Sequence, residues 1–248
     1  MIALARAELL KLRSTRTALG LFLAILLVTL GPLILLLALL SRSDLAGGGL
    51  GVVAYLLVPM VLLVFGILGM TNEYRHRTIT YAYLVTPRRW QVMAVKLAVY
   101  ALVGIATMLF TVVLVYVVTR IGASLRDVEI DATDGATLGD YTRQIVVAGL
   151  ITAFGVALGA LFRAQVLTVA GTLLWALVVE ILIGAFKPAV GGWLPFTVFN
   201  QVSAVSMGAD PGAAGATLSR PQAFIVSLVY IAIVSVAAIF ISLRRDVT

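Results

Sequence analysis

The chain has 248 residues, of which 62% are hydrophobic and only 12% are charged, and its mean hydropathy is +1.11. An average soluble domain has roughly 25% charged residues, so this composition excludes a soluble globular protein. Cysteine is absent, which excludes disulfides, thiolate chemistry and cysteine-based metal sites, and the formal net charge is +7.

Six runs with few or no charges are long enough to cross a bilayer, which takes about 20 apolar residues in a helix. The first run is too long for the apolar part of a signal peptide, which has about 7–15 residues. The fifth reaches the required length only by including Glu180. We therefore expect an all-α membrane protein with a single transmembrane domain over 1–248. Its six predicted spans are 18–40, 51–71, 95–118, 144–162, 165–185 and 222–243.

Residues 1–17 precede the first span and are too charged to cross the membrane. Leucines alternate with charged residues, and Glu8 and Lys11 stand one helical turn apart, where their side chains can pair. This pattern predicts an amphipathic helix that lies in the plane of the headgroups. The alternative is a solvated N-terminal tail.

A basic segment with several tyrosines, NEYRHRTITYAYLVTPRRWQVMAVK (72–96), separates the second and third spans. Asn72 is a favourable N-cap, and Glu73 suits the first turn of a helix because of the helix dipole. Pro87 stops helices, so the sequence predicts a helix over 73–86. Basic and aromatic residues in such a segment either anchor it to lipid headgroups or bind a cytoplasmic protein.

The loop over 120–143 is rich in acidic residues. Asp127, Glu129 and Asp131 have the spacing that begins an EF-hand calcium loop, but the glycine and the glutamate that complete such a loop are missing. We expect a solvated loop here and no metal site.

Two features inside the predicted spans are candidates for packing or function. Gly155 and Gly159 stand one turn apart and allow close helix packing, either inside the chain or against another subunit. Glu180 lies near the outer end of the fifth span. It is either a carboxylate that reaches the outer interface or a residue with a substrate or proton role.

The segment 189–209, AVGGWLPFTVFNQVSAVSMGA, is uncharged and nominally long enough to form a seventh span. Its glycines, proline and polar residues make a weak span, and a seventh crossing would reverse the side of the C-terminus. We expect a re-entrant or interfacial segment on the outer face, because irregular backbone at membrane depth must be covered by protein or line a cavity.

The distribution of Lys and Arg predicts the orientation of the spans. With the N-terminus in the cytoplasm, twelve Lys and Arg residues lie in inner segments and six lie in outer segments. Both termini are therefore expected in the cytoplasm. The basic charge is explained by this topology and by contact with anionic lipid, so nucleic acid is not an expected partner.

The architecture and the motifs of segment 72–96 resemble the permease subunit of the type-2 ABC exporter family. The similarity consists of E-x-R-x-x-T followed by a Pro-Arg-Arg group and a lysine, which here are Glu73, Arg75, Thr78, Pro87, Arg88, Arg89 and Lys96. One departure is Arg77, where the family pattern has glycine. The closing ISLRRDVT is also similar to the short ending of that family.

This resemblance implies a function, partners and site residues. Helix 73–86 would be the coupling helix that binds a separate ATPase subunit, through Glu73, Arg75, Arg77, Thr78 and Tyr83. The complex would contain two ATPase subunits, which bind ATP and magnesium, and a second identical or homologous permease. The substrate pathway would be lined by spans two and five. The residues nominated there are Tyr55, Phe65, Trp175 and Glu180.

The chain itself has no G-x-x-x-x-G-K-[ST] loop, so we expect no ATP hydrolysis and no bound cofactor in this polypeptide. A secondary transporter or channel and a non-transporting membrane scaffold are the alternative functions. A high ratio of Arg to Lys with abundant Ala, Gly and Val is typical of a GC-rich bacterial genome. The expected location is the bacterial inner membrane.

Overall fold

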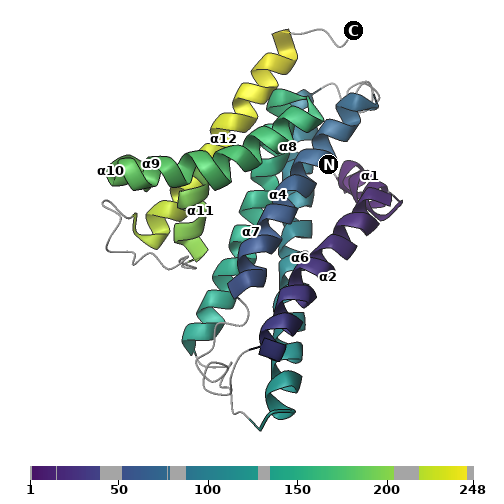
Figure 1. Cartoon of the computed structure of the whole chain (residues 1–248). Helices are drawn as coiled ribbons and strands as arrows, with labels where there is room; N and C mark the ends of the chain where they lie inside the picture. The colour runs from purple at the N-terminus through teal and green to yellow at the C-terminus, as the bar shows by residue number, and fades with distance from the viewer. Residues whose placement is uncertain are drawn as a thin grey trace.

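The computed structural model describes residues 2–14, 16–39, 52–76, 78, 88–127, 135–203 and 218–244. All regular structure in these residues is helical, and the long helices form a bundle (Figure 1). In chain order the helices are α1 (Ile2–Ser14), α2 (Arg16–Leu39), α4 (Val52–Arg75), α6 (Arg89–Ser124), α7 (Gly135–Phe162), α8 (Gln165–Leu174), the π-helical turn η1 (Trp175–Val179), α9 (Glu180–Phe186), α10 (Pro188–Gly191), α11 (Pro195–Ser203) and α12 (Arg220–Arg244).

Six helical stretches are long and apolar enough to cross a membrane, and the chain is a multi-pass membrane protein. The predicted all-α fold with six apolar helices is therefore confirmed. The stretches are Leu19–Leu39, Tyr55–Arg75, Trp90–Ser124, Leu138–Phe162, Gln165–Phe186 and Arg220–Ile241.

Several helices extend beyond the spans that the uncharged runs predicted. Helix α6 has 36 residues, Arg89–Ser124, whereas the predicted span was 95–118. Helix α7 begins at Gly135, inside the loop expected over 120–143. A charged residue ends an apolar run without ending a helix, because Lys, Arg and Glu are good helix formers and the backbone hydrogen bonds continue through them.

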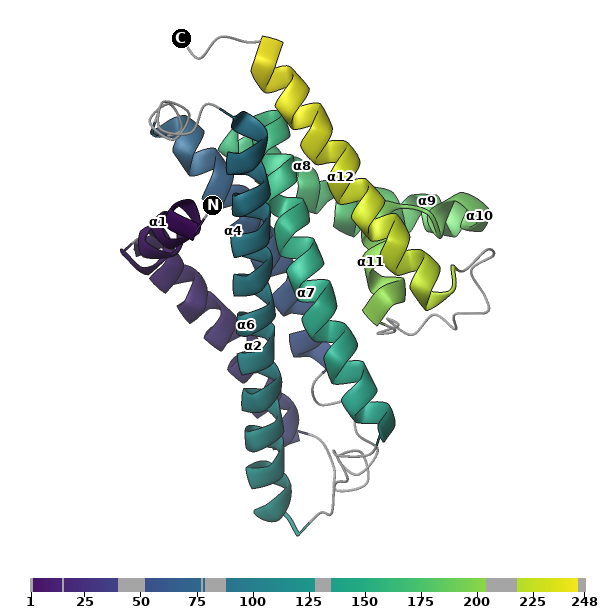
Figure 2. The same ribbon diagram turned by 180° about the vertical axis from the view of Figure 1, so that it is seen from behind.

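Helix α7 lies at the centre of the bundle, between α4, α6 and α12 (Figures 1 and 2). Its apolar span is 67% buried, whereas that of α2 is only 17% buried. Small residues on α7 allow this central position, because they let neighbouring backbones approach closely. Outward-facing side chains such as Leu27 and Leu102 are more than half exposed. Such a surface suits contact with lipid.

The fifth span consists of α8, η1 and α9 in one continuous stretch. Figures 1 and 2 show α9 and α10 extending away from α4 and α6. Most large apolar side chains of this stretch are exposed, including Leu177, Ile181 and Phe186. The five-residue π-helical turn at Trp175–Val179 interrupts its regular α-helical geometry.

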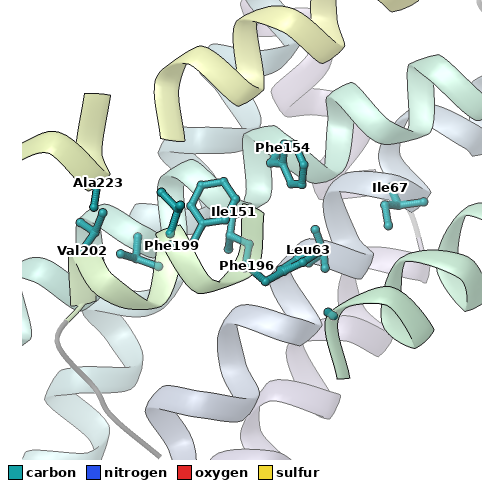
Figure 3. Close-up of a cluster of buried hydrophobic side chains, with 11 residues drawn as sticks. Leu63, Ile67, Ile151, Phe154, Phe196, Phe199, Val202 and Ala223 are labelled. Carbon is teal, nitrogen blue, oxygen red and sulfur yellow. The ribbon is translucent and has the colours of Figure 1, made fainter. Parts of the chain in front are cut away.

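The segment expected over 189–209 is described as far as Ser203, and this part is a broken helix. Helix α10 ends at Gly191, a turn follows, and α11 begins at Pro195. Helix α11 packs on α7 and α12, where Phe196 and Phe199 contact Phe154 (Figure 3). This pairing of short helices beside the bundle, residues 188–203, is called the α10–α11 segment below.

Candidate functional site

Four charged side chains from three helices meet at the end of the bundle where α1 lies. Lys96 of α6 donates to Glu8 Oε2 of α1 and to Glu73 Oε1 of α4, in both cases over 2.7 Å. Lys11 of α1 donates to Glu8 Oε1 over 2.9 Å and to the same Glu73 oxygen over 3.0 Å. These four residues, called the charge cluster below, join α1, α4 and α6.

The charge cluster is buried except for Lys11. The side chain of Lys96 is 1% exposed, that of Glu8 is 4% exposed and that of Glu73 is 10% exposed, whereas that of Lys11 is 46% exposed. Moving one charge from water into an apolar interior costs several kcal/mol, and partners of opposite charge with good hydrogen bonds offset this cost. The cluster meets this condition in large part, because two carboxylates face two ammonium groups and three of the four carboxylate oxygens accept from a lysine, while Glu73 Oε2 is buried without a hydrogen-bond partner.

The lysines keep the carboxylate of Glu8 ionised. Burial alone would raise the pKa of Glu8, but Lys96 and Lys11 outweigh burial and hold that pKa below its ordinary value. Burial would lower the pKa of Lys11, but hydrogen bonding to Glu8 and the charges of both carboxylates outweigh it and raise that pKa. Both shifts favour the charged forms, so this part of the cluster is ionic at neutral pH.

The structure places Glu73 differently from the sequence prediction. Glu73 was expected in the first turn of a separate helix with Asn72 as its N-cap, but α4 continues without a break to Arg75. The carbonyl oxygen of Glu73 accepts the N–H of Thr78 over 3.0 Å, a bond that closes a helix at its C-terminal end. The expected helix start is therefore a helix end, because the charge cluster stabilises Glu73 within α4.

The departure from the resembled family at Arg77 falls at this helix end. The bond from Thr78 to Glu73 is the outer hydrogen bond of a common closing motif, which favours glycine at the position just before the donor. That position is residue 77, where the family pattern has glycine and this sequence has arginine. The departure therefore concerns how α4 ends.

The other residues predicted to bind an ATPase are only partly described. Arg75 is exposed at the same end of the bundle, where its Nη1 donates to Gln165 Oε1 of α8 over 3.3 Å. Thr78 is also exposed. Arg77 and Tyr83, with the rest of the predicted helix beyond position 78, lie outside the described residues.

Sequence reasoning found only part of the charge cluster. The expected pair of Glu8 with Lys11 is confirmed at 2.9 Å. Lys96 was singled out only as part of the family motif, and its bond to Glu8 across 88 positions was not expected. One signal was available, because Lys96 is the only charged residue between positions 90 and 119. A lone charge in an apolar span is costly and implies a partner elsewhere in the chain.

A second buried carboxylate belongs to Glu180, which is 4% exposed. Its oxygens accept hydrogen bonds from Trp175 Nε1 at 2.9 Å and from the backbone N–H groups of Phe196 at 3.1 Å and Thr197 at 2.9 Å. The hydroxyl of Thr197 donates a fourth bond over 3.1 Å. The carboxylate of Glu180 is therefore turned inward, toward the start of α11, and does not extend from the surface of the chain.

The four residues nominated for a substrate pathway lie in three separate places. Trp175 and Glu180 form the hydrogen-bonded pair described above. Phe65 is buried, with its ring centroid 5.2 Å from that of an aromatic residue on α6. Tyr55 is half-buried, and its ring centroid lies 6.0 Å from that of a tyrosine on α7. Of the four, the structure brings together only the pair on the fifth span.

Gly155 and Gly159 both face α4 within the bundle. A Cβ atom at Gly155 would overlap the carbonyl oxygen of Leu63, and one at Gly159 would lie 2.8 Å from the carbonyl oxygen of Ile67. Gly66 of α4 faces the same contact from the other side, against the backbone of α7. Of the two possibilities left open by the sequence, the structure shows packing inside the chain.

A scan of the sequence against models of protein families finds no match, and a search of the curated proteins finds none either. Sequence and geometry together describe a helical membrane protein with two buried carboxylate sites. One is an ionic cluster that joins three helices, and the other is a carboxylate bonded to neutral donors at the start of α11.

Proposed function

We propose that this chain is the transmembrane permease subunit of an ATP-driven exporter of the type-2 ABC family. In this proposal the connection between α4 and α6, residues 76–88, binds an ATPase subunit. The observation that carries the proposal is the charge cluster, since Glu73 in the last turn of α4 is paired with Lys96 in the second turn of α6. The motif resemblance of the same segment adds to this argument.

The charge cluster gives the connection a firm attachment to three helices. The pair of Glu73 with Lys96 closes the connection at its base, and Glu8 attaches α1 to the same lysine. Separating these helices would leave a buried charge without its partner, which is strongly destabilising. A protein that binds and moves the connection would therefore displace α1, α4 and α6 together. Transmission from a soluble ATPase to the spans needs this mechanical property.

The proposal includes an orientation in the bacterial inner membrane. The excess of Lys and Arg in segments at the α1 end favours a cytoplasmic location for this end and for both termini. Helix α1 would lie in the inner headgroup layer, where its exposed Leu9 and Leu10 contact lipid. The α10–α11 segment would then be the outer re-entrant segment.

The proposed complex contains two ATPase subunits and a second permease, identical or homologous to this chain. ATP and magnesium would be bound by the ATPase subunits, since this sequence has no phosphate-binding loop. The chain would act as a dimeric pathway and not as an enzyme, with membrane lipid and no nucleic acid among its partners. Of the four residues nominated for that pathway, Tyr55, Phe65 and Trp175 stay candidates, whereas the carboxylate of Glu180 is already bonded to groups of the chain itself.

A secondary transporter or channel is supported less well by the contacts. Such a protein commonly uses an ionisable side chain at membrane depth to bind an ion or a proton. Glu180 and Lys96 are buried inside the described spans, and both are already bonded to groups of the protein itself. A scaffold without transport activity predicts no dependence on an ATPase, which the experiment below measures.

The experiment is to identify an ABC ATPase encoded in the neighbouring genes, to express it together with the tagged full chain, and to purify the pair in mild detergent. We expect a complex with magnesium-dependent ATP hydrolysis. Arg75→Ala and Tyr83→Ala should each reduce the bound ATPase at least tenfold, while Arg120→Ala, an exposed arginine at the opposite end of α6, should not. Absence of a complex, or equal binding by all variants, would show that the proposal is wrong.

A further inference from the structure

The carboxylate of Glu180 has no acceptor capacity left for a ligand. Its Oε1 accepts from Trp175 Nε1 and from the N–H of Phe196, and its Oε2 accepts from the N–H and the hydroxyl of Thr197. An ionised carboxylate offers about four acceptor positions, two on each oxygen. All four are occupied by groups of the chain itself. This arrangement argues for a role of Glu180 within the fold.

Two of these donors are backbone groups that need a partner. The first N–H groups of a helix have none inside that helix, and Phe196 and Thr197 are the second and third residues of α11. This helix end is buried, because Phe196 packs on Phe154 of α7 and belongs to the same buried cluster as Leu63 of α4 (Figure 3). Both contact residues lie well inside apolar spans, where an unpaired N–H costs several kcal/mol.

The π-helical turn just before Glu180 keeps this residue on the buried side of the fifth span. Buried residues recur at intervals of four along the stretch, at Thr168, Thr172, Ala176 and Glu180. In a regular α-helix each such step rotates the side chain by about 40° beyond a full turn, so the stripe would drift off one face. The wider turn at Trp175–Val179 reduces this rotation.

We propose that Glu180 is the positioning residue of the α10–α11 segment. Its carboxylate caps α11 inside the apolar layer, and the π-helical turn holds the carboxylate in register for this contact. Other side chains hold the turn that precedes α11. Tyr230 donates to the carbonyl oxygen of Trp193, and Gln201 donates to that of Gly192. The inference does not depend on the proposed function, because it concerns how this segment is held in any membrane protein of this fold.

The absence of cysteine makes single-cysteine labelling a clean test. Ser203→Cys places a probe at the end of α11, where the native residue is 3% exposed, and Ser235→Cys is the matched control on α12, where the native residue is 6% exposed. The measurement is the rate of reaction with N-ethylmaleimide in membranes. In the Glu180→Ala background we expect the rate at position 203 to rise at least tenfold and the rate at position 235 to change less than twofold.

Glu180→Gln distinguishes positioning from a general effect on folding. The glutamine carbonyl still accepts from a backbone N–H, so this variant should restore most of the protection at position 203. If the protein with Glu180→Ala is too unstable to isolate, the Gln variant should still show a rise of about twofold to fivefold at position 203 alone. Unchanged labelling at position 203 in both variants, or an equal rise at position 235, would overturn the proposal.

Inserting one residue tests the register of the fifth span around the π-helical turn. Val178 is 43% exposed, and one alanine added after it rotates Glu180 by about 100° away from α11. We expect this insertion to raise labelling of the cysteine at position 203 as much as Glu180→Ala does, with no further rise when both changes are combined. Val178→Ala keeps the register and should leave labelling unchanged. Continued protection after the insertion would overturn the role of this register.

Discussion

The hydrogen bonds of the two buried carboxylate sites come from different kinds of donor. In the charge cluster, Glu8 and Glu73 face the ammonium groups of Lys96 and Lys11, and the partners come from three helices. At the other site, Glu180 has no cationic partner among the described residues and is bonded to four neutral donors. The first site joins long helices at the end of the bundle, and the second holds a short helix against its side.

This difference predicts how each site responds to change. Removing a charge from an ionic cluster leaves its partner buried and uncompensated, so the whole group of helices is affected. Neutral donors around a carboxylate lose hydrogen bonds when it is removed, but no opposite charge is left behind. The charge cluster should therefore be the more sensitive site, and Glu180 should tolerate a neutral amide in its place.

The largest effect is expected for Lys96→Met, which keeps an unbranched side chain only one atom shorter but removes its charge. Glu8 and Glu73 would then share only the half-exposed Lys11, so we expect a loss of about 3–5 kcal/mol. The measurement is the thermal unfolding midpoint in detergent, with the exposed Lys187→Met as control. Adding Glu8→Gln and Glu73→Gln to Lys96→Met should recover stability. Equal midpoints for the Lys96 and Lys187 variants would contradict an ionic role for the cluster.

Glu180→Ala should have the next largest effect. It leaves the N–H groups of Phe196 and Thr197 without an acceptor, at about 1–3 kcal/mol for each group that stays buried. The unfolding midpoint of Glu180→Gln should lie close to the native value. The midpoint of Glu73→Gln, in the charge cluster, should lie well below it. The same thermal measurement compares these variants. Similar losses for Gln at both sites would remove the distinction between ionic and neutral stabilisation.

Acid should weaken the charge cluster in a way that depends on Glu8. The pKa of Glu8 is held below its ordinary value in the folded protein, so its stabilisation is fully present above the unfolded pKa, about 4.3, and is lost as the pH falls through the folded pKa. We therefore expect the difference in unfolding midpoint between the native protein and Glu8→Gln to shrink from pH 7 to pH 3. A constant difference across this range would contradict the assignment.

The smallest effect is expected for Lys11→Ala. The side chain of Lys11 is 46% exposed, and ion pairs of this kind contribute about 0–1 kcal/mol and are weakened by salt. The unfolding midpoint of the Lys11→Ala variant should lie close to that of the native protein, and closer still at high ionic strength. A loss as large as that of Lys96→Met would show that Lys11 is an equal member of the cluster.

Local patterns in the sequence were sufficient for the main elements. Six apolar runs predicted six apolar helices, and the alternation of leucine with charged residues predicted a helix before the first of them, observed as α1. The spacing of Glu8 and Lys11 predicted their pair. Gly, Pro and polar residues predicted that 189–209 would not be one regular span, and its described part is broken at residues 192–194. Each of these patterns involves residues that are close in the chain.

The ends of helices and the partners of buried charges were decided by the tertiary structure. Asn72 and Glu73 have the residue types of a helix start, yet they lie in the last turns of α4, because Lys96 and Lys11 stabilise Glu73 there. The acceptor role of Glu180 depends on N–H groups 16 and 17 positions away. Hydropathy and helix propensity are sums over neighbouring residues, so they predict which segments are helical and apolar. The partner of a buried charge depends on which helices pack together, and that is a property of the whole bundle.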